Sequence, residues 1–351
     1  MQTKTQQHER LFWPDAAKAI CMLLINYMHI RMYYNIPDNI FNNTFTSLYG
    51  PFFVNAFFVI TGYFFFNKQL NTPIVNETFT QYYKESGKKQ VLNVMFRILI
   101  PSLLFSILTF VPKVILKSGS FDLDFFLNKT ILGGSYWFTS ALISAYIIIL
   151  IPIFLRIKNI GFYIIYAIIC AFLGNYLLPY KLPWEFAPGL VATLFIVSGG
   201  VIGKYSHIIF KYLKWPVILA LIIIYTTLTV VLDINITTET YNESFNINGY
   251  LVSLLGSIIL IAICQKLPYC KFLAFIGKNS ILFYFLCGAI PYTIIKFVNI
   301  IEYKSELIFI IIFVLINIIM YLCVHLIVKY LPMLIDLRNI KKPKRPQISN
   351  K

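Results

Sequence analysis

Residues 14–29 read PDAAKAICMLLINYMH, an apolar stretch that nevertheless carries an acid, an amine, an amide and an imidazole. In a helix that turns by about 100° per residue, Lys18 and His29 return to almost the same azimuth three turns apart. Asp15 lies one turn before Lys18, and Asn26 lies one turn before His29. The four side chains therefore share one stripe about 20 Å long. Because ionisable groups inside a membrane are costly, this stripe predicts a functional site or pathway.

The composition is that of a membrane protein. Of the 351 residues, 58% are hydrophobic and 13% are charged, and the mean hydropathy is +0.73. A soluble domain of this length does not need so much apolar surface, so the sequence predicts an all-α, polytopic membrane bundle. The six cysteines are scattered without a CxxC pair or a metal-ligand spacing, so neither a disulfide framework nor a metal site is expected.

The apolar runs predict about ten transmembrane helices. They fall at residues 16–34, 47–67, 91–116, 136–155, 160–178, 188–204, 214–232, 249–265, 273–297 and 306–331. We expect a single integral-membrane domain over residues 1–335, followed by a basic cytoplasmic tail at 336–351.

The charges of the loops test this topology independently. With the N-terminus placed in the cytoplasm, most of the 30 Lys and Arg residues fall in inside segments, and most of the 14 Asp and Glu residues fall outside. This is the positive-inside pattern, and it predicts that both termini are cytoplasmic. The formal net charge of +16 then reflects contact with an anionic lipid bilayer surface, so nucleic acid is not an expected partner.

Several residues are candidates for binding an anionic donor at the inner face. Lys88 and Lys89 precede the third apolar run, and Arg97 lies about a turn and a half inside it. Such a cluster can hold the phosphates of a nucleotide-bearing donor such as coenzyme A, although positive-inside charge alone also explains the two lysines. Asn279 and Ser280 resemble a helix N-terminus that could receive an anionic cofactor, or they could serve only as a cap.

Five residues are candidates for contact with the acceptor substrate. Asn55 is a polar group at depth in the second run, where it could line a cavity or bond a neighbouring helix. Tyr136 and Trp137 begin the fourth run and suit either an aromatic belt or a platform for a sugar. Glu185, in an expected outer loop, could contact an acceptor or stay solvated, and Tyr284 lies in the ninth run.

His29 has two interpretations. It could be an interfacial residue near the outer end of its helix, with Lys18 extending to the inner surface. The shared stripe favours a neutral imidazole that acts as general base on a hydroxyl. A base of this kind fits acyl transfer from a thioester to an alcohol, a reaction that requires proton removal but no metal.

Six short motifs, taken in chain order, resemble those of acyltransferase family 3, the multi-span bacterial enzymes that O-acylate cell-surface glycans. They are Lys18 to His29, Phe57-Phe58-Val59-Ile60-Thr61-Gly62-Tyr63, Arg97-Ile98 with Pro101, Tyr136-Trp137-Phe138, Ser198-Gly199-Gly200-Val201-Ile202-Gly203-Lys204, and Gly277-Lys278-Asn279-Ser280 with Tyr284. The resemblance covers about residues 10–330 and is closest to the single-domain members similar to the enterobacterial-common-antigen O-acetyltransferase.

The resemblance implies His29 as the essential histidine, Lys18 in the place of the usual Arg, and Arg97 near the acyl donor. It also implies an acetyl-CoA donor, or another acyl-CoA, and a glycan or lipid-linked saccharide as the acceptor. Lys18 and Asp15 would position or charge-balance the donor end. A protein of this kind is expected in the bacterial inner (cytoplasmic) membrane.

Three positions depart from the family pattern. Lys18 keeps the charge of the usual Arg but loses its bidentate geometry. Val94 stands where a basic residue is common, and Cys287 stands where many members have a second His.

Two other function classes stay open at this point. A polysaccharide or lipid-linked-sugar exporter could share the fold, and it would need a polar path across the whole membrane. A catalytically silent partner or sensor in a surface-polymer machine is the third class. The sequence is also compatible with a homo-oligomer.

Overall fold

The computed structural model describes residues 11–35, 40–71, 88–117, 123–231, 247–298, 305–336 and 338. In this part of the chain the regular structure is helical, without strands. The α-helices are α1 (Trp13–Tyr34), α2 (Ile40–Tyr49), α3 (Asn55–Asn71), α5 (Lys88–Val94), α6 (Ile100–Lys117), α7 (Leu123–Phe126), α8 (Trp137–Phe154), α9 (Ile160–Leu177), α10 (Phe186–Lys204), α11 (Ser206–Tyr212), α12 (Trp215–Val231), α13 (Ile247–Cys264), α14 (Lys271–Lys278), α15 (Ser280–Leu286), α16 (Ala289–Val298) and α17 (Glu306–Tyr330). Two π-helical segments are η2 (Met95–Leu99) and η3 (Leu127–Ile131), and three 3-10 turns are η4 (Leu178–Tyr180), η5 (Pro183–Glu185) and η7 (Pro332–Leu334).

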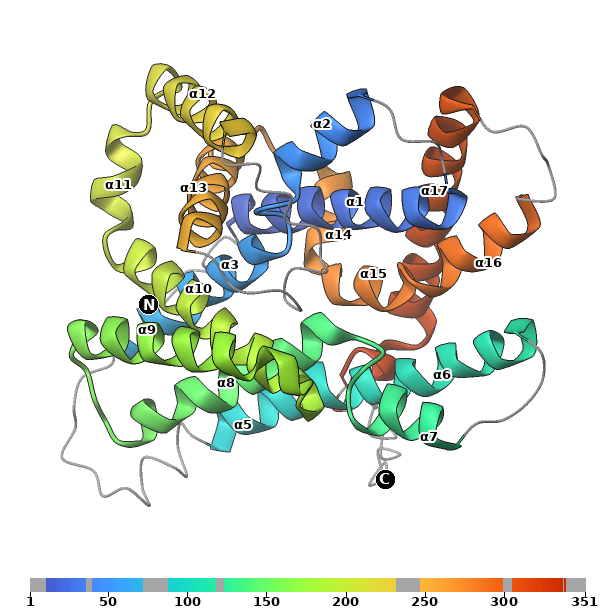
Figure 1. Cartoon of the computed structure of the whole chain (residues 1–351), viewed down its shortest axis with the longest axis horizontal. Helices are drawn as coiled ribbons and strands as arrows, with labels where there is room; N and C mark the ends of the chain where they lie inside the picture. The colour runs from blue at the N-terminus through green and yellow to red at the C-terminus, as the bar shows by residue number, and fades with distance from the viewer. Residues whose placement is uncertain are drawn as a thin grey trace, which may run out of the picture.

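Helix α1 forms where the sequence predicts it and lies in the middle of the molecule (Figure 1). Pro14 at its start fits the first turn, where a backbone N–H has no partner in the helix, and Asp15 faces the positive end of the helix dipole. The helix ends at Asn35, whose φ of 51° is left-handed and whose N–H bonds to Arg31. Helices α3, α13, α14, α15, α16 and α17 all contact α1.

Seven helices or continuous helical segments of the described chain are long and apolar enough to cross a membrane. They are Lys88–Phe110, Trp137–Phe154, Ile160–Tyr180, Pro183–Lys204, Ile247–Cys264, Ser280–Phe297 and Glu306–Tyr330. An eighth arises if α11 and α12, which meet at 91°, are one broken span. A multi-pass helical architecture is therefore confirmed, whereas the count of ten spans and the cytoplasmic side of the termini stay predictions. Of the predicted tail 336–351, all but two residues lie outside the described ranges.

Two predicted runs are wrong as single helices. Run 47–67 is interrupted at residues 50–54, because Pro51 lacks an N–H and disfavours helical geometry in the residue before it. Run 273–297 is divided at Asn279 into α14 and the span Ser280–Phe297, and within that span a smaller break at residues 287–288 separates α15 from α16. The second break directly precedes the first turn of α16, in which Pro291 is tolerated.

Helices α3 and α10 cross closely because glycines line the crossing. A Cβ added to Gly62 would lie 1.8 Å from the carbonyl oxygen of Ile196, and one added to Gly199 would lie 2.0 Å from the carbonyl oxygen of Val59. Since no real side chain fits at such distances, the backbones approach as small-residue interfaces in membranes do. Gly62 is therefore a packing residue of the α3–α10 interface.

Gly62→Ala should destabilise the folded protein by about 1–3 kcal/mol or more, because its methyl group must push two backbones apart. Gly288→Ala is the matched control, since a Cβ there would meet no atom within 4 Å. Thermal unfolding of the purified proteins in detergent measures the difference. Equal melting temperatures for the two variants would contradict the close crossing.

Candidate functional site

The polar stripe of α1 is fully enclosed at two of its four positions. Asp15 is 5% exposed and Asn26 is 0% exposed. Asp15 lies where α1 crosses α14, since a Cβ added to Gly277 would come within 1.8 Å of the Asp15 carbonyl oxygen. Asn26 Nδ2 donates to Oδ1 of Asn317 in α17 at 2.9 Å, and Asn317 Nδ2 donates to the carbonyl oxygen of Phe313 at 2.8 Å. Protein therefore surrounds the stripe both at Asp15, near the start of α1, and at Asn26, about three turns further on.

Lys18 and His29 lie on the protein-facing side of the same helix. At about 100° per residue their azimuths fall between those of Met22 and Ile25. These two neighbours are 1% and 5% exposed, whereas Lys18 and His29 are only partly buried. Both side chains therefore share the side of α1 on which Met22 and Ile25 are buried. That they line a functional site, and the chemical roles of these residues, stay predictions.

Aromatic rings adjoin the imidazole. The ring of His29 stacks on that of Tyr33, with centroids 5.9 Å apart and planes at 20°. Tyr33 in turn meets Tyr292 of α16 edge to face at 5.5 Å. His29 therefore lies on the side of α1 that α16 covers.

Tyr136 and Tyr284, from distant parts of the sequence, come together at the start of α8. Their ring centroids lie 5.7 Å apart. The Tyr136 hydroxyl donates to the carbonyl oxygen of Phe285 at 2.8 Å, and the Tyr284 hydroxyl accepts from the backbone N–H of Phe138 at 3.2 Å. That N–H belongs to the first turn of α8 and has no partner within the helix, so Tyr284 caps α8. Trp137 is partly buried beside them.

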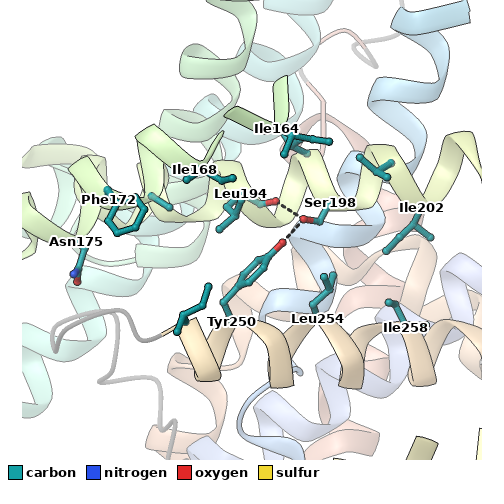
Figure 2. Close-up of a pocket in the computed structure, with 14 residues that line it drawn as sticks. Ile164, Ile168, Phe172, Asn175, Leu194, Ser198, Ile202, Tyr250, Leu254 and Ile258 are labelled. Carbon is teal, nitrogen blue, oxygen red and sulfur yellow. Dashed lines mark hydrogen bonds between the residues drawn. The ribbon is translucent and has the colours of Figure 1, made fainter. Parts of the chain in front are cut away.

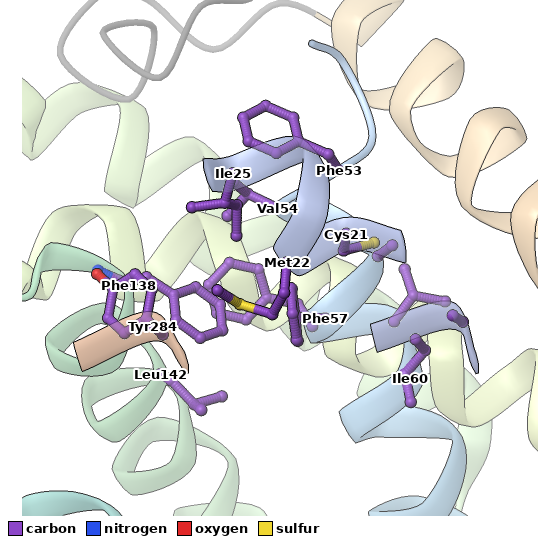
Figure 3. Close-up of a cluster of buried hydrophobic side chains, with 14 of the residues drawn as sticks. Cys21, Met22, Ile25, Phe53, Val54, Phe57, Ile60, Phe138, Leu142 and Tyr284 are labelled. Carbon is purple, nitrogen blue, oxygen red and sulfur yellow. The ribbon is translucent and has the colours of Figure 1, made fainter. Parts of the chain in front are cut away.

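This aromatic group is part of the core that contains α1. Figure 3 shows Met22 of α1 among Phe57, Phe138 and Tyr284, which belong to one buried cluster. The ring of Phe138 lies 5.4 Å from both Phe57 and Tyr284. Met22 follows Lys18 by four residues, one helical turn. The predicted aromatic residues and the stripe therefore share one part of the interior.

Asn55 connects two helices. Its Nδ2 donates to Ser253 Oγ of α13 at 3.1 Å and to the carbonyl oxygen of Pro51 at 2.9 Å, and the side chain is buried. These bonds favour the helix-bonding interpretation over contact with a substrate.

Glu185 ends the 3-10 turn η5 and directly precedes α10. Trp184 and Glu185 both have positive φ, 59° and 49°, which is costly for side chains of this size. The Trp184 carbonyl oxygen accepts from Ser144 Oγ at 2.8 Å, and its N–H donates to Leu132 at 2.9 Å. Ser144 lies seven residues into α8, about 10 Å along its axis. These bonds fix Trp184 against α8. Glu185 follows it directly and is partly buried, and its contact with an acceptor stays a prediction.

Arg97, one of the residues predicted to bind the donor, has a carboxylate partner that the sequence did not indicate. Lys88 and Lys89 are exposed at the start of α5. Arg97 lies in the π-helical segment η2, just before Pro101, and π-helical turns often occur at functional sites. Its Nε bonds to Oδ2 of Asp336 at 3.2 Å. Both segments are predicted to face inside, so the contact agrees with the expected topology.

The predicted helix start at Asn279 and Ser280 is real, but Asn279 does not cap it. The Asn279 side chain makes no capping bond to α15. Its Nδ2 instead donates to the carbonyl oxygen of Phe275 in α14 at 2.8 Å. Asn279 is buried and Ser280 partly buried, and both lie next to the α1–α14 crossing at Gly277. The side chain therefore stabilises the break between the two helices.

An apolar cavity of about 440 Å³ lies between α9, α10 and α13 (Figure 2). Ser198 and Tyr250 form a hydrogen bond within it, and Ser198 Oγ also donates to the carbonyl oxygen of Leu194 at 2.8 Å. Because a serine hydroxyl has one proton, Tyr250 is the donor to Ser198. Both hydroxyl protons are thus used within the protein, and none of the predicted site residues lines this cavity.

Sequence reasoning missed Asp336, Arg338 and Asn317. Asp336 and Arg338 stand at the start of a segment that we interpreted as a basic tail. A lone acid before such a charge run was the signal that could have found them. Asn317 is a single amide in the 25-residue helix α17, a position where a polar group needs a partner. The described residues contain no group of three His, Cys, Asp or Glu side chains placed to hold a metal.

The Asn26–Asn317 bond gives a stability test of the interior around the stripe. Asn26→Leu should cost about 1–2 kcal/mol, because it leaves the Asn317 carbonyl oxygen without its donor in an apolar interior. Asn26→Leu with Asn317→Leu should recover part of this loss. Unfolding of the wild type and of the two variants in detergent measures it, and a double variant no more stable than Asn26→Leu would contradict the pairing.

Comparison with known proteins gives one match, to the acyltransferase domain of family 3, over residues 11–328. No curated protein and no solved structure matches the chain. The match begins before α1 and ends within α17, so it includes the stripe, the aromatic group and Arg97. The chain therefore belongs to the acyltransferase 3 family of membrane acyltransferases.

Proposed function

We propose that this protein transfers an acyl group, in the first instance acetyl, from cytoplasmic acyl-CoA to a hydroxyl of a cell-surface or lipid-linked glycan. The bacterial cytoplasmic membrane is its proposed location. The observation that carries the proposal is the orientation of Lys18 and His29, which lie between buried neighbours on one side of α1 in a chain of this family. An imidazole on the protein-facing side of α1 can meet a substrate inside the bundle, whereas one that faces lipid cannot.

His29 supplies the acid–base chemistry in this proposal. Its neutral imidazole takes the proton of the acceptor hydroxyl as the oxygen attacks the thioester carbonyl carbon. The carbon–sulfur bond then breaks, and the imidazolium returns the proton to the departing thiolate. The products are the O-acyl ester and CoA. A relay in which His29 carries the acyl group itself is the alternative order of the same transfer.

The charged groups at the inner end hold the donor. Arg97, with Lys88 and Lys89 on the same continuous helical segment, would bind the phosphates, since a guanidinium matches phosphate geometry. Lys18 and Asp15 would lie along the path toward the thioester. Asn279 and Ser280 adjoin this region through Gly277 and α1. Tyr136, Trp137, Tyr284 and Glu185 would face the acceptor.

His29→Ala should reduce the release of CoA from acetyl-CoA, in the presence of a glycan acceptor, by at least about 100-fold. Purified protein in detergent and a thiol reagent provide the assay. The matched control is His325→Ala, because His325 is exposed on α17.

The result separates the three function classes. Full activity of folded His29→Ala would reject the role of His29. Absence of acetyl-CoA binding by the wild-type protein, together with glycan translocation, would favour an exporter, and absence of both would favour a silent partner.

A further inference from the structure

A cluster of five residues ties the end of the described chain to the helix that bears Arg97. The carboxylate of Asp336 is 8% exposed, and it accepts from Arg97 Nε at 3.2 Å and from Arg338 Nε and Nη2 at 2.8 and 2.6 Å. The backbone N–H of Arg338 adds a bond at 3.0 Å. These donors, Arg338 foremost, lower the pKa of Asp336 to about 2. The carboxylate therefore stays ionised at neutral pH.

The helical segment that bears Arg97 also holds the Arg338 side chain. Its Nη1 donates to Asn93 Oδ1 at 3.0 Å, and its guanidinium lies over the ring of Phe96 at 5.6 Å. Asn93, Phe96 and Arg97 are consecutive or nearly so on α5 and η2. The helix thus provides the surface on which the Asp336 segment rests, and its own Arg97 is the third partner.

Arg97 is held by one nitrogen only. Its side chain is 66% exposed, and among the described residues its terminal nitrogens, Nη1 and Nη2, make no hydrogen bond. Because Arg338 already balances the charge of Asp336, the positive charge of Arg97 is available to an incoming anion. Lys88 and Lys89 lie on the same helical segment, about 12–14 Å away along its axis.

We propose that Asp336 is a positioning residue of the donor site, which holds Arg97 by its Nε so that the two terminal nitrogens form a fork for a phosphate of the donor. Arg338 keeps Asp336 in place. This inference rests on the proposed function. It adds two residues that lie beyond position 328, where the family match ends.

The alternative role for Asp336 is competition with the donor for Arg97. In that case removal of the carboxylate would increase the affinity for the donor, whereas loss of a positioning residue would decrease it. The geometry favours positioning, because Asp336 occupies Nε and not the terminal pair. A fixed guanidinium loses less side-chain entropy when it binds a phosphate than a mobile one does.

The test is a binding cycle with acetyl-CoA on purified protein in detergent. Arg97→Ala and Asp336→Ala should each weaken binding about tenfold. The double variant should be no weaker than Arg97→Ala, because Asp336 acts through Arg97. Asp336→Glu should recover part of the loss, and Asp124→Ala, which removes an exposed carboxylate from α7, should change nothing.

A second donor separates positioning from folding. Acetyl-pantetheine has the thioester but none of the phosphates, so its turnover at saturating concentration should be the same in wild type and Asp336→Ala. Unchanged or tighter acetyl-CoA binding by Asp336→Ala would overturn the proposal, as would an equal loss with acetyl-pantetheine. If the wild-type protein binds no acetyl-CoA, the proposed function fails instead.

Discussion

The structure depends on the need to enclose the polar side chains of α1. An acid and an amide lie at 5% and 0% exposure in an otherwise apolar helix, and an amine and an imidazole share their side. In such surroundings each polar group must find a partner within the protein. Asn317 of α17 is the partner of Asn26, and α14 packs through Gly277 against the backbone of α1 at Asp15.

Run 273–297 contacts α1 through all three of its helices, α14, α15 and α16. Gly277 of α14 packs at Asp15, Tyr292 of α16 contacts Tyr33 beside His29, and Tyr284 of α15 caps α8. The glycine-lined crossing of α3 and α10 provides a rigid support on the other side.

Local pattern was enough to predict the helical class, most spanning helices and the stripe, because hydropathy and the helical period act within one segment. The interruption at Pro51 could also have been predicted, since proline lacks a backbone N–H. We instead assigned one helix to the whole apolar run. The Arg97–Asp336 contact joins residues 239 positions apart, and no pattern within a segment predicts such a pair. The place of the turn that bears Glu185 depends on another helix in the same way, because Trp184 bonds to Ser144 of α8.

The proposed roles of Arg97 and His29 place two demands on a donor. Arg97 and His29 belong to different helices, and Lys18 lies eleven residues before His29, about 16 Å along α1. In the proposed function, a donor held by its anionic end near Arg97 presents its reactive carbon to His29. An acyl-CoA suits this arrangement because a flexible arm separates its phosphates from its thioester, whereas an acyl phosphate has its charge next to the carbonyl.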